Sequence, residues 1–277
     1  YKVRGLYIGG GTPTALTCAQ LDRVIGTAME CFPGAREFTV EAGRPDTLDD
    51  EKLRMLRAHG VDRVSLNPQT MNDETLRRVG RDHTAEDIRR MYDEMHGMGF
   101  SVINMDLILG LPGETAEDVA RTLDAIAELT PENLTVHTLA IKRAAALRQT
   151  GYHADEEEAM RMVELAAHRA REMGYQPYYL YRQKYMSGSF ENTGWCKPGF
   201  TGWYNIYMME ELHTILSLGG GGMNKINLPA GQLERFHNPK SPQDYIARID
   251  TILQQKDEIF EILHRLAQQP PAPIEEE

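Results

Sequence analysis

Three consecutive glycines, Gly9–Gly11, end an apolar segment and are followed by Thr12, Pro13 and Thr14. Glycine has no side chain, so a ligand can approach its backbone N–H group closely. Threonine is a common helix cap, and proline suits the first turn of a helix. The pattern predicts a strand, an open main-chain edge and a helix start, which together can hold a small polar or anionic group. The alternative is a tight turn that uses glycine only for its conformational freedom.

Polar residues recur at every second position near the ends of three predicted strands. They are Thr39 and Glu41; Ser65, Asn67 and Gln69; and Asn104 and Asp106. Because side chains alternate between the two faces of a strand, Glu41, Gln69 and Asp106 are predicted to share the inner face of a barrel, where barrel enzymes place their sites. Two carboxylates in one lumen require a ligand, a cation or water. The alternative is a polar network satisfied within the protein.

The elements that position these residues alternate along the chain. Strands are predicted at 3–8, 37–41, 63–67, 101–109, 133–141 and 176–183, with helices near 15–30, 49–59, 84–98, 116–129 and 155–173. Repeated βα units indicate an α/β fold with a parallel sheet, here a barrel or partial barrel over residues 1–184. A smaller α+β region is predicted over 185–267, with a final helix from about 242 to 266, and a disordered acidic tail over 268–277.

Composition excludes several classes of function. The chain has 277 residues, with 30 basic and 41 acidic side chains and a net charge of −11, which disfavours a nucleic-acid partner. No apolar run approaches the ~18 residues that span a membrane. Cys18 and Cys31 lie at a predicted helix and Cys196 in a predicted Gly/Pro loop, too far apart for a disulfide framework. A reducing, cytoplasmic location is therefore expected.

A set of motifs gives the chain a family resemblance. The segments YIGGGTPTAL, VEAG, SLNPQTM, VGRDHT, NMDLILGLPGET and LTVHTLA occur in this order within residues 3–141. This order and spacing resemble radical S-adenosylmethionine (radical SAM) enzymes of the oxygen-independent coproporphyrinogen III dehydrogenase group. The later segments YYLYRQKYMSGSFENTG and LGGGGMNK resemble its HemZ-like branch. The resemblance implies a partial (β/α) TIM-type barrel that binds S-adenosylmethionine and a 4Fe–4S cluster.

The resemblance also assigns roles to individual residues. It places the methionine part of the cofactor on Gly10, Gly11 and Thr12, and the ribose on Glu41. Gln69, Arg81 and Asp106 are further cofactor contacts by the same resemblance, with a surface arginine as the alternative for Arg81. Ala140 and Met223 align with residues that bind a second cofactor molecule in some members, and core packing is the alternative for both.

The CxxxCxxC loop that supplies three thiolate ligands to the cluster in this family is absent from the sequence. Every other cofactor motif is present. We therefore expect the cluster ligands upstream of Tyr1, in a longer natural chain, and a degenerate paralogue is the alternative. The 277-residue chain itself is then expected to be inactive and to hold no metal ligands.

By resemblance, the function is oxidative decarboxylation of coproporphyrinogen III in haem biosynthesis, with an electron donor such as flavodoxin or ferredoxin. Arg182 and Lys184 lie two residues apart on one face of the sixth predicted strand, about 7 Å apart, and are predicted to bind substrate propionates. An edge strand whose basic residues face water is the alternative for this pair. Alternative functions are a haem or tetrapyrrole carrier and a radical SAM enzyme with another substrate. Tyr204 stands where the related haem-chaperone branch carries a histidine, which disfavours haem ligation there.

Overall fold

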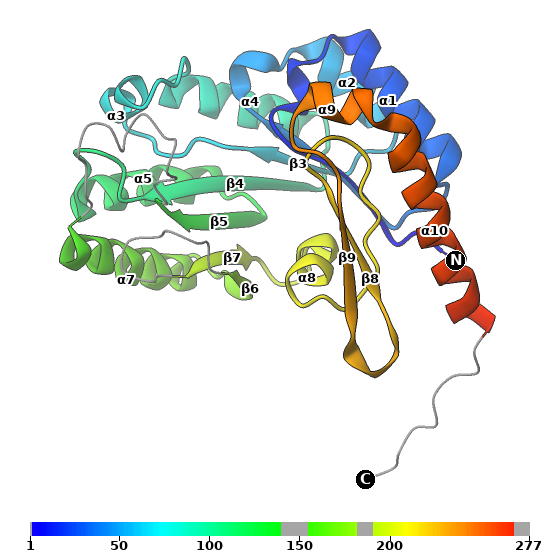
Figure 1. Cartoon of the computed structure of the whole chain (residues 1–277). Coiled ribbons are helices and arrows are strands. Elements are labelled where there is room, and N and C mark those ends of the chain that lie inside the picture. The colour runs from blue at the N-terminus through cyan, green and yellow to red at the C-terminus, as the bar shows by residue number, and fades with distance from the viewer. Residues whose placement is uncertain (1, 140–154, 182–190, 269–277) are drawn as a thin grey trace. The chain divides into compact units, whose positions relative to one another are not determined.

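The computed structural model describes residues 2–139, 155–181 and 191–268 (Figure 1). It comprises two compact units, Tyr1–Asn205 and Ile206–Glu277. The first unit contains the main sheet and the motifs of residues 3–141, whereas the segment LGGGGMNK lies in the second unit. Within the described residues, no helix combines the length and the apolar character needed to cross a membrane.

Five parallel strands form most of the sheet, in chain order: β1 (Gly5–Ile8), β2 (Glu37–Gly43), β3 (Arg63–Leu66), β4 (Val102–Leu109) and β5 (Asn133–Thr138). The helices of the first unit are α1 (Cys18–Cys31), α2 (Asp50–Ala58), α3 (Asp73–Arg78), α4 (Ala85–Gly97), α5 (Ala116–Leu129) and α7 (Glu156–Glu172). The helices follow the strands around one side of the curled sheet in Figure 1. The predicted partial (β/α) barrel is confirmed.

Two further strands complete the sheet beyond β5. Strand β7 (Asn192–Cys196) pairs antiparallel with both β5 and β6 (Gln176–Tyr181), so β6 is the edge strand. Strand β7 is absent from the predicted elements. Cys196, predicted to lie in a loop, instead ends this strand and is buried. The segment NTGWC is short and carries a glycine, because Tyr179 packs where a Gly194 side chain would lie. The sheet therefore extends past the boundary predicted after residue 184.

The core lies between the helices and one face of the sheet. Alternate strand residues contribute to it, such as Val40, Val64 and Met105, and each of these is at most 1% exposed. The helices contribute residues spaced three or four apart, such as Leu21 and Ile25 on α1. Because the core residues occupy every second position of a strand, the polar residues at the positions between them face the opposite side of the sheet.

The turn after β1 differs in detail from its prediction. Pro13–Ala15 forms a single 3₁₀ turn, and Thr12 makes no side-chain capping bond. Helix α1 begins at Cys18 and is capped by Thr17, which exchanges hydrogen bonds with Gln20 in a capping box. Thr14 is buried and donates to the carbonyl of Ala42 at 2.8 Å. The extra turn anchors the glycine segment to β2 before the helix starts.

The second unit is a small α+β assembly. A hairpin of β8 (Met223–Asn227) and β9 (Leu233–His237) packs with the helix α10 (Ile249–Gln268) through Ile226, Ile259 and Leu263. The predicted final helix is two helices, because α9 (Pro242–Ala247) ends at Arg248, which leaves helical geometry before α10. Helix α8 (Trp203–Met209) crosses the boundary between the units. The predicted tail lies outside the described residues from position 269 onward.

Candidate functional site

The candidate site lies on the face of the sheet opposite the helices, which we call the inner face. Its polar residues come from successive strands: Tyr7, Thr39, Glu41, Ser65, Asn104, Asp106 and His137. Thr39, Ser65 and Asn104 line one small cavity together. The predicted alternation, which puts the polar residues of these strands on one face of the sheet, is therefore confirmed at these three positions. Glu41 and Asp106 lie further along β2 and β4, nearer the carboxyl ends of these strands.

The carboxylate of Glu41 is held by two donors. The hydroxyl of Tyr7 donates to Oε1, and the backbone N–H of Gly10 donates to Oε2 at 3.1 Å. Burial raises the pKa of Glu41, the bonds from Tyr7 and Gly10 act to lower it, and the nearby Asp106 raises it. Asp106 is thus close enough to Glu41 for the two charges to interact, as the sequence predicts.

The glycines beside Glu41 have distinct structural roles. A side chain at Gly9 would come within 2.6 Å of Tyr7 and 2.8 Å of Glu41, so glycine is required there for the close approach of that pair. Gly10 has φ +122°. Gly10 and Gly11 are exposed, and a side chain at either would meet nothing within 4 Å. Thr12 follows them, half-buried. The backbone at Gly10–Gly11 is therefore accessible to a ligand that also reaches Glu41.

Asp106 is the centre of a second polar network. The amide of Asn104 donates to it at 2.7 Å, and Nε2 of His137 lies 3.8 Å from its carboxylate. Burial acts to raise the pKa of Asp106, but His137, Asn104 and Thr135 together hold it below its ordinary value. Tyr181 contacts the other ring nitrogen of His137 at 3.0 Å. Asp106 is therefore ionised at neutral pH and rigidly oriented.

Gln69 reaches this region by a different route from the one predicted. The β3–β4 register pairs Ser65 with Asn104, and its direct continuation would put Gln69 beside Ile108. Gln69 instead bridges to Leu107, with φ +68°, and its N–H donates to the carbonyl of Asp106 at 3.0 Å. The alternation argument is therefore wrong at Gln69, because the chain slips by one residue after Pro68. Backbone bonds tie Gln69 to Asp106, and Gln69 is buried.

Arg81 follows α3 and is half-buried rather than fully exposed. Burial and the neighbouring Arg44 lower its pKa, while Asp46 raises it. Arg44 and Asp46 form an ion pair at 2.6 Å just beyond the carboxyl end of β2. Arg81 thus lies near the ends of the strands that carry the site. His83, also buried here, contacts the carbonyl of Pro68 at 3.3 Å.

Four other predicted residues have different outcomes. Ala140, Arg182 and Lys184 lie outside the described residues. Met223 begins β8 in the second unit, is half-buried and pairs with His237 in the hairpin. A role for any of them stays a prediction.

A small cavity of about 40 Å³ lies at the amino-terminal end of the inner face. Tyr7, Tyr178 and Tyr204 contribute to its wall, with Ser65 and Asn133. The hydroxyl of Ser65 and the amide nitrogen of Asn133 are buried without a protein partner in the described part of the chain. A polar cavity of this size accommodates an ordered water molecule that would satisfy them.

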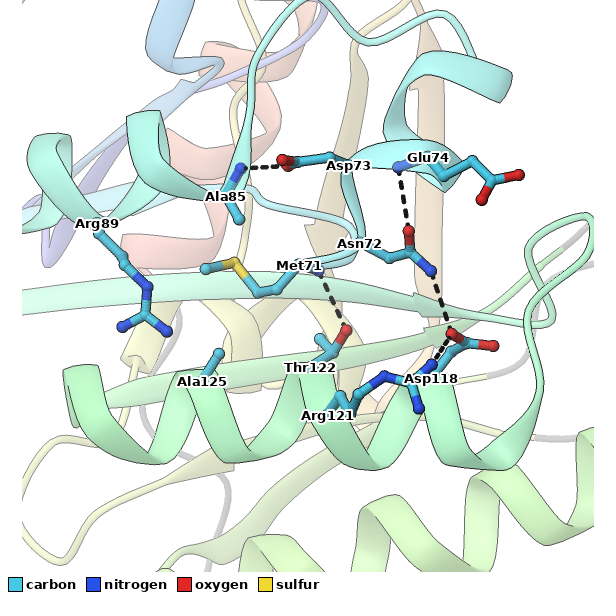
Figure 2. Close-up of a pocket in the computed structure, with 10 residues that line it drawn as sticks. All are labelled: Met71, Asn72, Asp73, Glu74, Ala85, Arg89, Asp118, Arg121, Thr122 and Ala125. Atoms are coloured by element: carbon cyan, nitrogen blue, oxygen red, sulfur yellow. Dashed lines mark hydrogen bonds and ion pairs between the residues drawn. The ribbon is translucent and has the colours of Figure 1, made fainter.

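A larger groove, of about 380 Å³, lies among α3, α4 and α5 (Figure 2). Its polar side chains already pair with protein groups: Asn72 donates to Asp118 at 3.1 Å, and Arg89 pairs with Glu128 at 2.7 Å. Thr122 accepts from the N–H of Met71, and Asp73 accepts from that of Ala85. The groove shares no residue with the inner face. Its polar groups stabilise helix packing and favour no ligand.

The cysteines give no metal site in the described part of the chain. Cys18 is half-buried, Cys31 exposed and Cys196 buried, and all three are free. No group of three or more His, Cys, Asp or Glu side chains is arranged to hold a metal ion there.

Sequence reasoning missed several residues of the site. Tyr7 and His137 lie within the quoted motifs YIGGGTPTAL and LTVHTLA, but nothing in the spacing of these motifs distinguishes the two side chains. The available indication was the alternation of side chains along a strand. Tyr7 lies two residues before Gly9, and His137 two residues after Thr135, so each shares a strand face with that residue.

The comparisons with known proteins agree with this geometry. Residues 1–126 match the family model of the radical SAM superfamily. The oxygen-independent coproporphyrinogen-III oxidase-like protein HemZ of Bacillus subtilis is 42% identical over 94% of this chain and 54% of its own length. The heme chaperone HemW of Bacillus subtilis is 34% identical over 50% of this chain and 38% of its own length.

Among solved structures, the coproporphyrinogen III oxidase HemN of Escherichia coli matches with a TM-score of 0.72 and 25% identity, over 90% of this chain and 57% of that chain. The chain therefore spans about half the length of HemZ and of HemN. Strands β1 to β4 and the two inner-face carboxylates, Glu41 and Asp106, fall within residues 1–126, the part that matches the family model. The chain contains a radical SAM domain over residues 1–126, and as a whole it is similar to oxygen-independent coproporphyrinogen-III oxidase-like proteins.

Proposed function

We propose that the inner face binds S-adenosylmethionine and that the protein at its natural length uses it, with a 4Fe–4S cluster, to decarboxylate the propionates of coproporphyrinogen III oxidatively. The observation that supports this is the pair of inner-face carboxylates, Glu41 and Asp106, beside the open backbone of Gly10 and Gly11. S-adenosylmethionine presents ribose hydroxyls, an ammonium and a sulfonium, which are the donors and cations that carboxylates attract.

The residues present fit this ligand. Among the described residues, Glu41 accepts one bond from Tyr7 and one from Gly10, so its oxygens retain acceptor capacity for ribose hydroxyls. Gly10, Gly11 and Thr12 would hold the methionine part, and Gln69, Arg81 and Asp106 would provide further contacts. Ala140 and Met223 would serve a second cofactor molecule.

The chain's own groups bind, orient and exclude water, while the cofactors supply one-electron chemistry when bound. For each propionate, a C–H bond and the bond to the carboxylate break, carbon dioxide leaves and a vinyl group forms. The hydrogen atom would be taken up by the deoxyadenosyl part of S-adenosylmethionine, and the remaining electron by an external one-electron acceptor. Asp106, which is half-buried and ionised, and its partners Asn104 and His137 give this face a fixed charge pattern before any ligand arrives. A one-electron donor such as flavodoxin or ferredoxin and a cytoplasmic location are part of the proposal.

Cluster uptake tests whether these 277 residues can hold the cluster by themselves. We expect this chain, reconstituted anaerobically with iron and sulfide, to take up no 4Fe–4S cluster, because three thiolates at suitable spacing are absent from its sequence. Iron and sulfide analysis with the visible absorption spectrum provides the measurement. Stoichiometric cluster formation would instead identify Cys18, Cys31 or Cys196 as ligands.

Arg182 and Lys184 are proposed to bind substrate propionates. In cluster-loaded protein of natural length, Arg182→Ala should weaken coproporphyrinogen binding by about 1.5–3 kcal/mol, the usual contribution of a hydrogen bond to a charged group. Cleavage of S-adenosylmethionine without substrate should stay at the wild-type rate. Normal substrate binding by the variant would remove this assignment.

A haem-carrier function is the second candidate, favoured by the similarity to the heme chaperone HemW. The two functions predict different results for the natural-length protein. The enzyme forms 5′-deoxyadenosine and a vinyl product from coproporphyrinogen under reducing, anaerobic conditions. A carrier instead shows saturable haem binding in a spectral titration and leaves coproporphyrinogen unchanged. Deoxyadenosine formation without a change in coproporphyrinogen would indicate a radical reaction on another substrate.

A further inference from the structure

Tyr7 connects the candidate ligand-binding carboxylate to a distant part of the chain. Its hydroxyl donates to Glu41, and its ring stacks on that of Tyr204, with centroids 3.9 Å apart and an interplanar angle of 12°. Tyr204 is separated from Tyr7 by almost the whole first unit, yet the two rings contact face to face. The orientation of the Tyr7 ring is therefore fixed both at its hydroxyl and on its face.

The segment that carries Tyr204 is itself anchored to the sheet. The carboxylate of Glu37 accepts the N–H groups of Trp203 and Tyr204, each at 2.8 Å. Next to them, the amide of Asn205 donates to the hydroxyl of Tyr178 at 2.9 Å. Glu37 is only 5% exposed, so these bonds are shielded from water. Tyr204 is therefore held in place by β2 and β6.

We propose that Tyr7 is a positioning residue for Glu41, orienting its carboxylate to accept the hydroxyls of a ribose-bearing ligand, and that Tyr204 holds Tyr7 in place. The inference rests on the proposed function, since it uses Glu41 as the ribose contact. It assigns to Tyr7 and Tyr204 a role that the motifs do not assign.

Hydrogen-bond counting supports this role. A carboxylate offers about four lone-pair sites on its two oxygens. Tyr7 uses one site on Oε1 and Gly10 uses one on Oε2. Within the part of the chain that the structure describes, one site on each oxygen is left, which matches the two hydroxyls of a ribose. Without Tyr7, the side chain would be fixed at one oxygen only and could rotate away from the ligand.

The local backbone is also built for this pair. The Gly9 position would place a side-chain carbon 2.6 Å from the ring of Tyr7 and 2.8 Å from the carboxyl carbon of Glu41. A larger residue at this position would collide with the Tyr7–Glu41 pair. Glycine is therefore needed here for that contact, whether or not a ligand binds at Gly10 and Gly11.

The test is equilibrium binding of S-adenosylmethionine, by calorimetry, to natural-length protein reconstituted anaerobically and kept without reductant. Tyr7→Phe keeps the ring and its stacking but removes the donor, and we expect roughly tenfold weaker binding. Tyr175→Phe is the matched control, because it removes another buried tyrosine hydroxyl, one that donates to the carbonyl of Pro131. This control should bind like the wild type.

The pH profile separates positioning from a general loss of structure. Glu41 is faced by Tyr7, by the N–H of Gly10, and by Asp106 and Tyr204, and the bond from Tyr7 lowers its pKa. Removing that bond should raise the pKa of Glu41. The loss of binding on acidification should therefore begin at a higher pH in Tyr7→Phe than in the wild type, whereas Tyr175→Phe should leave the profile in place.

A second pair of variants keeps the test decisive if Tyr7→Phe folds poorly. Tyr204→Phe retains the stack and should bind normally, while Tyr204→Ala should bind several-fold more weakly. Wild-type affinity and an unshifted profile in Tyr7→Phe, or wild-type affinity in Tyr204→Ala, would overturn the inference. Absence of binding by the wild-type protein would instead contradict the proposed function.

Discussion

Replacing Asp106 with alanine should abolish S-adenosylmethionine cleavage in the reconstituted natural-length protein, with a rate loss of at least about 100-fold, equivalent to about 2.7 kcal/mol. The variant removes the half-buried anion of the inner face and leaves the amide of Asn104 and the ring of His137 without their shared partner. The fold should survive, because removing a polar group of this kind costs only a few kcal/mol. Deoxyadenosine release, measured by chromatography beside the circular-dichroism spectrum, separates the two effects.

The matched control for this variant is Asp118→Ala. Asp118 also makes several hydrogen bonds, to Asn72, Thr115 and Arg121, but it lies in the helix groove shown in Figure 2. Its loss should lower the melting temperature and leave cleavage unchanged. Cleavage by Asp106→Ala at the wild-type rate, or loss of cleavage in Asp118→Ala, would contradict the placement of the site.

The largest effect on stability is expected at Glu37. Glu37→Ala removes two hydrogen bonds to the start of α8 and leaves Arg63, whose side chain is 12% exposed, without the carboxylate 3.7 Å away. Breaking a buried ion pair from one side typically costs about 3–5 kcal/mol. For a protein of this size the melting temperature should fall by roughly 6–20 °C, at about 2–4 °C per kcal/mol. Thermal or urea unfolding provides the measurement.

Two further variants test whether the loss of stability in Glu37→Ala comes from the ion pair with Arg63. Glu164→Ala, on the exposed face of α7, should change the unfolding free energy by no more than about 0.5 kcal/mol. Combining Glu37→Ala with Arg63→Met should recover part of the loss, because the unpaired cation is then removed as well. A loss below about 1 kcal/mol for Glu37→Ala would show that Arg63 is sufficiently paired by Asn133 and Phe200, to which it donates at 3.2 Å.

The sequence predicts the orientation of strand side chains best where one face of the strand packs on helices and its residues alternate regularly. The alternation in β2 and β4 correctly predicts that Glu41 and Asp106 turn away from the core, because one face of each strand packs on helices. The same alternation fails at Gln69, where the chain adopts φ +68° and slips its register. The alternation within one strand does not predict such a shift of register, since the shift depends on how the segment pairs with its neighbour β4.

Strand β7 and the stacking of Tyr7 on Tyr204 are not predicted from the sequence, because both depend on contacts between residues far apart in the chain. Strand β7 is recognisable only through its partners β5 and β6, and its glycine is explained by the ring of Tyr179 from the neighbouring strand. The stacking of Tyr7 on Tyr204 joins residues from opposite ends of the first unit. The helix cap at Thr17 was missed for a local reason, because the 3₁₀ turn at Pro13 delays the helix start.

The central claim is that the inner face of the sheet holds S-adenosylmethionine. The most direct measurement is a crystal structure of the reconstituted natural-length protein with this ligand bound. The account predicts the ribose hydroxyls hydrogen-bonded to Glu41 and the methionine part against Gly10 and Gly11. A ligand bound elsewhere, as in the groove among α3, α4 and α5, with Glu41 contacting only Tyr7 and Gly10, would contradict it.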